Sequence, residues 1–304
     1  MKNKSITALV SAFARAYHAE HNQIKIFDDR LARELLTNEE YANISSNMSK
    51  GITFFLPEFT GTQEECLRAI VDWQLSPSPL GRAAFAEQAL QNAVTLGARQ
   101  YLIFAAGYDT FAYRQPDFAD NLQIFEIDHP ATGDDKQRRI SSLHWHVPSN
   151  VHYIPADFLD PDWQKRVLAC PAFDPDQISF SSLLGISYYL PKNSFKQLLS
   201  AIVSLLPSGS SIVFDYPDEL TFTPQAGERA QKQLMMAAQA GEPMQASYSY
   251  RELEQMLEEL NLLIYRHLTP AEITRQLFKA YNDSQPAHPI TAFDNVNYCL
   301  AVKR

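Results

Sequence analysis

The chain has 304 residues, of which 45% are hydrophobic and 20% are charged. This composition provides material for one large hydrophobic core or two modest ones, and it excludes a disordered chain, a collagen and a coiled coil as descriptions of the whole protein. Lys and Arg number 26 against 35 Asp and Glu, which gives a formal net charge of −9. No nucleic-acid partner is expected, because proteins that neutralise phosphate backbones concentrate positive charge.

The cysteine and histidine patterns predict neither disulfides nor a metal site. Cys66, Cys170 and Cys299 lie far apart without a C-x-x-C pair, which fits a reducing cytoplasm. His144 and His146 form an H-x-H pair with no third ligand in sight, a pattern typical of a surface loop. We therefore expect a cytoplasmic protein without a bound metal.

The N-terminal residues predict an amphipathic helix over 5–19 rather than a secretory signal. Lys2 and Lys4 precede the run, but Arg15 interrupts it before an export core is complete. The apolar residues recur at three- and four-residue spacing: Ile6, Leu9, Val10, Phe13 and Tyr17. Nowhere do about 18 uncharged apolar residues run together, so no membrane span is predicted.

Apolar residues continue to recur at three- and four-residue spacing, which is typical of helices, to about residue 98. Further helices are predicted at roughly 28–37, 62–75 and 81–97, and the stretch 51–61 is expected to be a loop. Thr62 and Glu65 have the spacing of a capping box, and the Ser-Pro-Ser-Pro run at 76–79 is expected to break the chain before the last of these helices. Residues 1–98 are predicted to form a helical cap packed on the rest of the chain.

Short β-rich runs alternate with helical stretches after residue 98. They lie at 100–105, 122–128, 151–157, 178–184, 211–215, 262–267 and 296–302. Runs that are apolar throughout suit strands covered on both faces, as in a parallel sheet flanked by helices. Residues 99–304 are therefore predicted to form a doubly wound, Rossmann-like α/β core, with crossover helices at 195–206 and after Ser249. A helical lid insertion is predicted at about 218–248, because this stretch is too long for a simple connection.

The residues that follow the predicted strands suggest a ligand site. In an open parallel sheet, ligands bind beyond the carboxyl ends of the strands. The first strand leads into Ala105-Ala106-Gly107, a turn of small residues that a ligand can approach closely. The second strand ends at Asp128, which lies 21 residues past Gly107, the distance at which a nucleotide-binding sheet places a carboxylate on ribose hydroxyls.

The third and fourth strands add to this pattern. Asp157 offers an acceptor for an exocyclic amine, Phe158 an aromatic edge beside a base, and Leu184 an apolar wall for a flat ring. Taken singly, each of these residues has an ordinary role in packing or in a turn. Taken together they predict an adenosine-containing cofactor, either a dinucleotide or S-adenosylmethionine.

The phosphate-binding turn distinguishes these two cofactors. A dinucleotide site usually carries G-x-G-x-x-G, so that a helix N-terminus can hold the pyrophosphate, whereas this turn has Ala105 first and the bulky Tyr108 after Gly107. A cofactor without phosphates is favoured. A nicotinamide dehydrogenase is a further alternative, which selective NADH binding would support.

The segment GARQYLIFAAGYDTFAYR at 97–114 resembles the most specific motif of the leucine carboxyl methyltransferase and polyketide O-methyltransferase family, class I enzymes that use S-adenosylmethionine. The similarity runs from about residue 5 to the C-terminus. Other blocks match the family in order: EIDHP at 126–130 with Lys136, ADF at 156–158, YLP at 189–191 and FDY at 214–216. The resemblance implies a seven-stranded, mostly parallel sheet whose last strand is antiparallel.

The resemblance also implies roles for single residues. Asp128 would bind the ribose, Asp157 and Phe158 the adenine, and the turn at Gly107 would lie beneath the methionine part. Arg82, on the helix before the sheet, would pair with the methionine carboxylate, for which a guanidinium is well shaped. Ala105 stands where the family has its first motif glycine, and Leu184 where the family has glutamate. Both departures are expected to reduce cofactor affinity.

The predicted function is O-methyl transfer from S-adenosylmethionine to a carboxylate or hydroxyl of a small molecule, with an aromatic or polyketide-like acceptor as one candidate. A carboxylate arrives ionised, whereas a hydroxyl benefits from a base. No residue is assigned as that base; the candidates are His129, His144, His146, His152, Tyr188, Tyr189 and His267. Tyr188 and Tyr189, after the fourth strand, are expected to face the substrate.

Other features bear on the acceptor and on the alternatives. An apolar acceptor pocket is predicted from a set of aromatic residues: Phe54, Phe55, Phe59, Phe222 and Tyr248. The departures at Ala105 and Leu184 motivate an alternative function, a non-catalytic cofactor-binding or scaffolding protein that keeps the fold. The choice between a monomer and a homodimer stays open.

Overall fold

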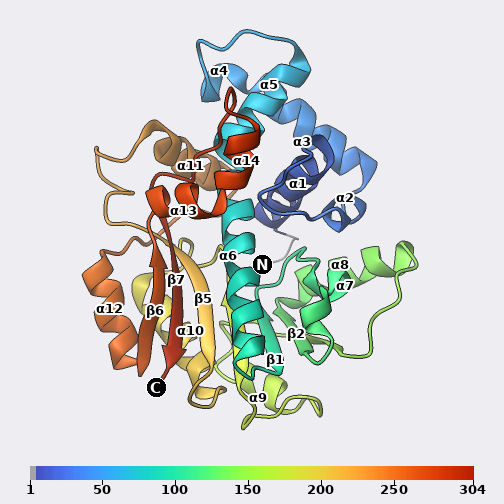
Figure 1. Cartoon of the computed structure of the whole chain (residues 1–304), viewed down its shortest axis with the longest axis vertical. Coiled ribbons are helices and arrows are strands. Elements are labelled where there is room, and N and C mark those ends of the chain that lie inside the picture. Colours follow the sequence, from blue (N-terminus) through green and yellow to red (C-terminus); the bar gives the residue numbers. More distant parts are fainter. Residues whose placement is uncertain (1–4) are drawn as a thin grey trace.

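The computed structural model describes residues 5–304, so Lys2 and Lys4 lie outside the described residues. A seven-stranded sheet runs through the molecule in the order β3-β2-β1-β4-β5-β7-β6 (Figure 1). Only β7 is antiparallel to its neighbours β5 and β6; the remaining pairs are parallel. The strands are β1 (Gln100–Phe104), β2 (Gln123–Asp128), β3 (Val151–Pro155), β4 (Ser179–Leu183), β5 (Ser211–Pro217), β6 (Leu262–Leu268) and β7 (Val296–Lys303). The predicted doubly wound sheet with an antiparallel last strand is confirmed.

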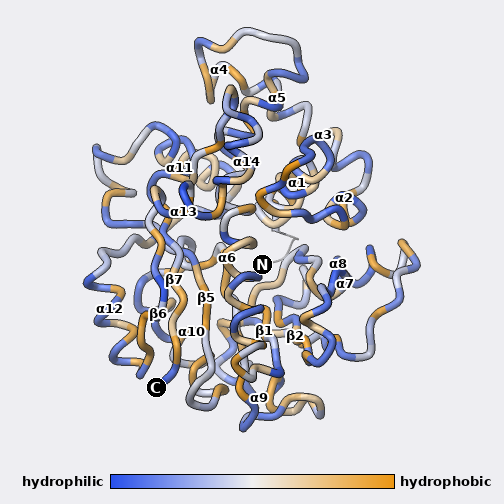
Figure 2. The backbone as a smooth tube through the Cα atoms, viewed as in Figure 1, coloured by the Kyte–Doolittle hydropathy of each residue, from blue (hydrophilic) through white to orange (hydrophobic). Residues whose placement is uncertain are grey.

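Strand boundaries agree closely with the apolar runs of the sequence. Residues of β1, β4 and β5 are buried throughout, as expected for central strands covered on both faces. Figure 2 shows the same pattern: orange segments gather in the central strands, while the helices alternate between polar and apolar residues. The continuous apolar runs that predicted the central strands therefore reflect burial of these strands on both faces.

Helices cover both faces of the sheet. On one face α6 (Pro77–Thr95) and α13 (Pro270–Leu277) pack in a cluster that contains Phe85, Tyr101 and Ile273. On the other face α9 (Trp163–Leu168), α10 (Lys192–Ser204) and α12 (Tyr250–Glu259) pack around Phe195 and Phe214. The remaining elements of this part are α7 (Phe111–Arg114), η2 (Asp117–Ala119), α8 (Pro130–Ser142), α11 (Glu228–Gln239) and α14 (Lys279–Ser284).

The N-terminal helices have a separate hydrophobic cluster above the carboxyl edge of the parallel strands (Figure 1). They are α1 (Ile6–His21), α2 (Leu31–Glu34), α3 (Asn38–Lys50), α4 (Ile52–Phe55), α5 (Gln63–Ile70) and the π-helix η1 (Val71–Leu75). Phe13 and Tyr17 of α1 are buried in this cluster, which also contains Tyr108 and Ile140 from the sheet-containing part. These shared contacts dock the helical cap on the ends of the strands.

The helical cap differs from the sequence expectation in four places. The stretch 51–61, expected to be a loop, contains the short helix α4. The helix predicted at 28–37 shrinks to the four residues of α2, and α3 was not predicted at all. Thr37 and Glu40 form a capping box at the start of α3, so the signal was present in the sequence. In addition, α6 begins at Pro77 instead of after the Pro run, because proline is tolerated in the first turn of a helix.

Candidate functional site

The strand-end residues singled out in the sequence meet at one edge of the sheet. In the register of the parallel strands, Phe104 pairs with both Ile127 and Leu183, and Asp128 pairs with Pro155. The turn after β1, Asp128, the segment 156–158 and the segment 184–185 therefore follow neighbouring strands at the same edge. This is the place where open α/β sheets bind ligands.

Asp128 links the second strand to the turn after the first. Its Oδ2 accepts a hydrogen bond from the backbone N–H of Gly107 at 2.6 Å, and its Oδ1 accepts one from the N–H of His129 at 2.6 Å. Burial raises the pKa of this carboxyl above its usual value, and the two backbone hydrogen bonds oppose the rise. A carboxylate has about four lone-pair sites, so each oxygen can still accept from one hydroxyl of a diol.

The turn after β1 has a left-handed backbone at two positions. Ala105 has φ 52° and Gly107 has φ 53°. Gly107 takes this conformation without cost, whereas the Cβ of Ala105 makes it unfavourable by about 1–2 kcal/mol. A Cβ placed on Gly107 would lie 3.5 Å from the Cβ of Ala8, so α1 passes directly over the turn. The substitution of the family glycine by Ala105 thus introduces backbone strain here.

Asp157 and Phe158 follow β3 beside Asp128. Asp157 Oδ1 accepts from the N–H of Leu159 at 3.0 Å, which is a turn role, while Oδ2 lies 4.0 Å from His129 Nε2. Phe158 packs edge-on against Trp163 at a ring-centroid distance of 5.2 Å. Asp157 keeps acceptor capacity on Oδ2, and the ring of Phe158 is half-buried.

Arg82 crosses from α6 to the ends of β4 and β5. Its Nη1 lies 3.4 Å from Oδ2 of the fully buried Asp215, and its Nη2 donates to Ser11 Oγ of α1 at 3.3 Å. The guanidinium occupies the space above Gly185, where a Cβ would lie 2.3 Å from Nη1. Asp215 Oδ1 also accepts from the N–H of Gly185 at 2.6 Å. Leu184, just before this glycine, packs partly buried against the first hydrophobic cluster.

The two tyrosines after β4 have different surroundings. Tyr188 is buried, and its hydroxyl donates to Asp215 Oδ2; burial and the nearby Asp215 raise its pKa well above 10. Tyr189 is half-buried near α1, and burial raises its pKa to about 12. Backbone carbonyls of both residues accept from Gln245, at 2.6 Å for Tyr188 and 2.7 Å for Tyr189. Of the pair, Tyr189 is the one left accessible to a ligand.

Among the candidate bases, His129 is the histidine that lies at this edge. Its Nδ1 accepts from the N–H of Ala131 at 3.2 Å, as the N-cap of α8. His152 bonds Gln123 at the opposite end of β2, and His267 bonds the hydroxyl of Tyr216. Within residues 5–304, no group of three or more His, Cys, Asp or Glu side chains is placed to hold a metal ion.

The predicted aromatic acceptor pocket does not form. Phe55 is buried in the N-terminal cluster, whereas Tyr248 is buried against Phe195 in the cluster on the far face of the sheet. The other three side chains are exposed: Phe54, Phe59 and Phe222. That prediction is wrong, because the two buried residues belong to different hydrophobic clusters and the other three side chains are exposed.

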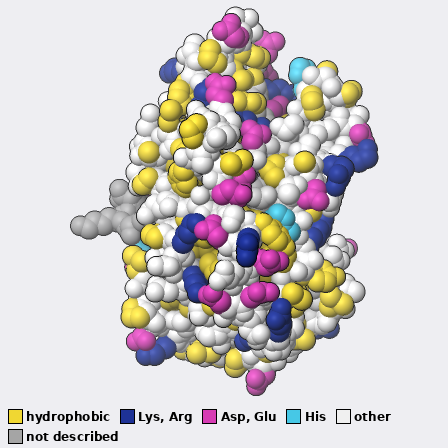
Figure 3. Space-filling model, turned by 90° about the vertical axis from the view of Figure 1, so that its left-hand side faces the viewer, with side chains coloured by type: hydrophobic (Ala, Val, Ile, Leu, Met, Phe, Trp, Pro, Cys, Tyr) yellow, Lys and Arg dark blue, Asp and Glu magenta, His cyan; other side chains and the backbone are white. Residues whose placement is uncertain are grey.

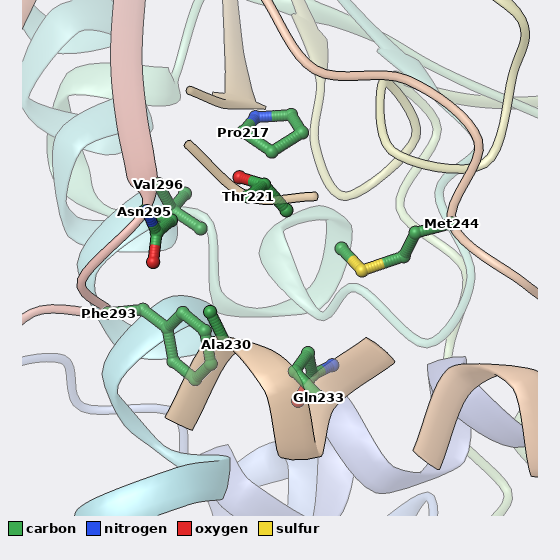
Figure 4. A pocket seen from close by; sticks show the side chains of 8 residues that line it. All are labelled: Pro217, Thr221, Ala230, Gln233, Met244, Phe293, Asn295 and Val296. Atoms are coloured by element: carbon green, nitrogen blue, oxygen red, sulfur yellow. The ribbon is translucent and has the colours of Figure 1, made fainter. Parts of the chain in front are cut away.

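A narrow pocket lies beyond the end of β5 instead. Figure 4 shows it between the ends of β5 and β7, helix α11 and Met244. Its volume is about 10 Å³, which is about the room needed by one water molecule. It is lined by Pro217, Thr221, Ala230, Gln233, Met244, Phe293, Asn295 and Val296. The segment predicted as a lid therefore contacts the edge of the sheet next to Asp215.

Several residues at this edge were not predicted to have a role. Asp215 was mentioned only as part of the FDY block that matches the family and was given no role. A carboxylate within an otherwise apolar strand nevertheless indicates that it has a buried partner. Ser11, Arg15 and Asp29 of the N-terminal segment reach the same edge through hydrogen bonds to Arg82 and to the turn after β1. Nothing in their local sequence identifies them.

Comparisons with known proteins place this chain in one class. The chain matches the family model of leucine carboxyl methyltransferase over residues 8–203. A Bacillus subtilis (strain 168) protein named as an S-adenosyl-L-methionine-dependent methyltransferase is 40% identical over 312 residues, covering 100% of this chain and 99% of the relative. A Mycobacterium tuberculosis (strain H37Rv) protein of the same description is 34% identical over 144 residues, 45% of this chain and 40% of the relative.

Solved structures agree on the fold. A DUF574 family protein of Streptomyces avermitilis superposes with a TM-score of 0.59 at 17% identity, covering 84% of this chain and 97% of the other. A protein of Thermobifida fusca described as a methyltransferase gives 0.56 at 13% identity, covering 100% and 96%. At these identities the superpositions support the fold alone.

The sheet order and the strand-end residues, with these relatives, define a class I S-adenosylmethionine-dependent methyltransferase. The chain belongs to the leucine carboxyl methyltransferase family. The predicted family, enzyme class and cofactor are thereby confirmed, and the comparisons give no support to the nicotinamide and non-catalytic alternatives.

The surface and the helix lengths add two observations. On the face shown in Figure 3, Lys and Arg side chains are interspersed with Asp and Glu, and neither sign covers a large continuous area. Within residues 5–304, every helix is too short or too polar to span a membrane.

Proposed function

We propose that this enzyme methylates an oxygen of a small-molecule acceptor, and that a carboxylate is the acceptor group it suits best. The observation that carries the proposal is the arrangement at the carboxyl edge of the sheet. Asp128 and Asp157 lie there on neighbouring strands, and the Arg82 guanidinium lies at the ends of β4 and β5. The geometry suits a nucleoside along β2 and β3 and a methionine carboxylate at Arg82.

In this arrangement Asp128 holds the ribose diol, because each of its oxygens has a lone pair directed away from the backbone donors it already serves. Asp157 and Phe158 hold the adenine, and Leu184 provides an apolar wall. Arg82 exchanges part of its contact with Asp215 for the methionine carboxylate, a charge-assisted contact. The turn at Ala105 and Gly107 supports the methionine chain.

Transfer of a methyl group from a sulfonium is an in-line displacement, so the protein contributes alignment and exclusion of water. The titratable groups around Arg82 favour an acceptor that arrives ionised. Tyr188 is bonded to Asp215 and has a pKa well above 10, and Nδ1 of His129 already accepts from the N–H of Ala131. Tyr188 and Tyr189, whose pKa is raised to about 12, keep their protons and do not act as bases, whereas a carboxylate acceptor needs no base. The family's description points to the same acceptor group.

Calorimetry with S-adenosylhomocysteine tests the cofactor site. The wild-type protein should bind the ligand, and Asp128→Ala should weaken binding by roughly 1–3 kcal/mol, because two buried hydrogen bonds are lost. Absence of wild-type binding at millimolar ligand would reject the site. Unchanged binding by Asp128→Ala would reject the ribose assignment alone.

Product chemistry tests the acceptor group. The enzyme is incubated with methyl-labelled S-adenosylmethionine and matched sets of small carboxylic acids, phenols and alcohols. A methyl ester releases volatile methanol in mild alkali, whereas a methyl ether does not. Alkali-labile label in the carboxylic acid set is expected, and alkali-stable label in the phenol set alone would contradict the carboxylate assignment while leaving O-methyl transfer intact.

A further inference from the structure

A network of buried charged side chains joins the N-terminal cap to the turn after β1. Its centre is Asp29, in the segment between α1 and α2, whose side chain is 1% exposed. The carboxylate accepts from Arg15 Nε at 2.8 Å, from Thr110 Oγ1 at 2.5 Å and from the N–H of Ala32 at 3.2 Å. Burial opposes its ionisation, but Arg15, Arg114 and Thr110 outweigh burial and hold the pKa of Asp29 below its usual value.

The same network forms hydrogen bonds with the turn at a second point. Arg15 uses its remaining donors on Tyr108 O at 2.7 Å and on Ser11 Oγ at 3.0 Å. Arg114 Nε donates to Thr110 Oγ1 at 2.9 Å, so the Thr110 hydroxyl both accepts from Arg114 and donates to Asp29. The carbonyl of Tyr108 and the side chain of Thr110 are thereby tied to the cap.

These ties act on a strained piece of backbone. Ala105 is held at φ 52°, a conformation that a non-glycine residue keeps only where its surroundings over-determine it. One side of the turn is held by Asp128, through the N–H of Gly107. The other side is held by Arg15 and Thr110, and the partners of both converge on Asp29.

We propose that Arg15, Asp29 and Thr110 are positioning residues for the cofactor: they hold the turn after β1 in its strained form and couple docking of the N-terminal cap to cofactor binding. The inference rests on the cofactor site proposed above. None of the three is assigned a contact with the cofactor or with reacting atoms. They act on the position of Gly107, because the proposed site needs the N–H of Gly107 to stay hydrogen-bonded to Asp128. The coupling is reciprocal, because a ligand that needs the docked cap must also stabilise the docked cap.

The first experiment measures S-adenosylhomocysteine affinity by calorimetry. Thr110→Val removes the linking hydroxyl with little change in shape and should raise the dissociation constant about ten-fold, as expected for loss of a hydrogen bond to a charged group. Thr110→Ser keeps the hydroxyl and should restore affinity to near the wild-type value. Tyr101→Phe is the control, because it removes a buried hydroxyl contact between β1 and Ser182 of β4, and this hydroxyl makes no hydrogen bond to the turn.

Three outcomes separate the explanations. Loss of affinity in Thr110→Val with rescue by Thr110→Ser and little effect of Tyr101→Phe supports the proposal. Equal losses of affinity in Thr110→Val and Tyr101→Phe would mean that the network contributes only to general stability, and would overturn the proposal. Wild-type affinity in Thr110→Val, with Asp128→Ala impaired, would also overturn it while leaving the cofactor site intact; failure of the wild type to bind would instead reject the proposed function.

Hydrogen exchange provides a readout that a merely structural role would not change. Binding of S-adenosylhomocysteine to the wild type should slow amide exchange in α1, which meets the proposed site through the Arg15 contact with the turn and through the Ser11 contact with Arg82. Arg15→Lys, in which one ammonium replaces the fork that reaches both Asp29 and Tyr108, should lose most of this protection even at saturating ligand. Equal protection of α1 in Arg15→Lys and wild type would overturn the coupling.

Discussion

Arg82 and Asp215 face each other across the ends of α6 and β5, with Nη1 3.4 Å from Oδ2. The contact is long for a charge-assisted hydrogen bond, which is about 2.7–2.9 Å at its best, and Asp215 takes its short contacts from Gly185 and Tyr188 instead. Arg82 is thus held by Asp215 while its fork is left incompletely used. This is the state expected of a guanidinium that also receives a second carboxylate.

Replacing Arg82 by Lys should separate recognition of the methionine end from recognition of the nucleoside. Lysine keeps a positive charge opposite Asp215 but cannot make a forked contact. We expect S-adenosylhomocysteine to bind about ten-fold more weakly, by loss of one charge-assisted hydrogen bond, and 5′-methylthioadenosine, which has no carboxylate, to bind as in the wild type. Calorimetry with both ligands checks this. An equal loss for the two ligands would show that Arg82 supports the whole site instead of the carboxylate.

Gly185→Ala should expel Arg82 from its position. A Cβ at residue 185 lies 2.3 Å from Arg82 Nη1, and the backbone has φ +72°, so the variant adds a clash to left-handed strain. Gly209→Ala is the matched control, since it has φ +84° but meets only Ile178 Cδ1 at 3.8 Å. Both variants should lose roughly 1–2 kcal/mol of stability from the backbone alone. S-adenosylhomocysteine affinity, measured by calorimetry, should fall in Gly185→Ala and stay unchanged in Gly209→Ala; equal affinities would refute the clash.

Ala105→Gly should stabilise the protein. Glycine removes the penalty of the left-handed conformation at φ 52°, an expected gain of about 0.5–1 kcal/mol after the greater entropy of glycine in the unfolded chain is subtracted. Ala106→Gly is the control, because Ala106 is buried and lies outside the positive-φ positions, so its loss should destabilise. Urea unfolding of both variants checks the signs. A destabilised Ala105→Gly would mean that the methyl group contributes packing greater than the strain.

Asp72, on the π-helix, gives a prediction for pH dependence. Burial raises its pKa from 3.8 to about 6, although Arg68 lies 3.5 Å away and lowers it. The native state therefore binds more protons than the unfolded state between these values, and stability from this group falls as pH rises from about 4 to 6. Asp72→Asn removes the titration, so its stability relative to wild type should increase over that range and stay level above it.

Urea unfolding of Asp72→Asn and wild type at several values between pH 4 and 8 measures this difference. Asp162→Asn is the control for an acid-to-amide change, because the Asp162 side chain is 62% exposed. The difference for Asp162→Asn should vary much less with pH. A pH-independent difference for Asp72→Asn would show that Asp72 is ionised in the native state throughout the range.

The strands and the carboxylate on the second strand could be predicted because their signals are local. A strand buried on both faces needs a continuous apolar run, and parallel strands bring their ends to one edge whatever the rest of the chain does. Asp128 could therefore be placed at the carboxyl edge of the sheet from its position at the end of a run. The helix at Asn38–Lys50 was missed although its capping box and a short apolar stripe of Tyr41, Ile44 and Met48 were present, because most of its residues are polar.

The sequence by itself determined where the strands lie in the chain, the edge of the sheet at which the strand-end residues gather and the family to which the chain belongs, since all of these follow from short contiguous patterns. Only the tertiary structure decided which charges meet. Arg82 and Asp215 are 133 residues apart, and Asp29 and Thr110 are 81 apart. A buried charge is stable only with a partner, and that partner is chosen by how the helical cap docks on the sheet, a long-range event with no local pattern.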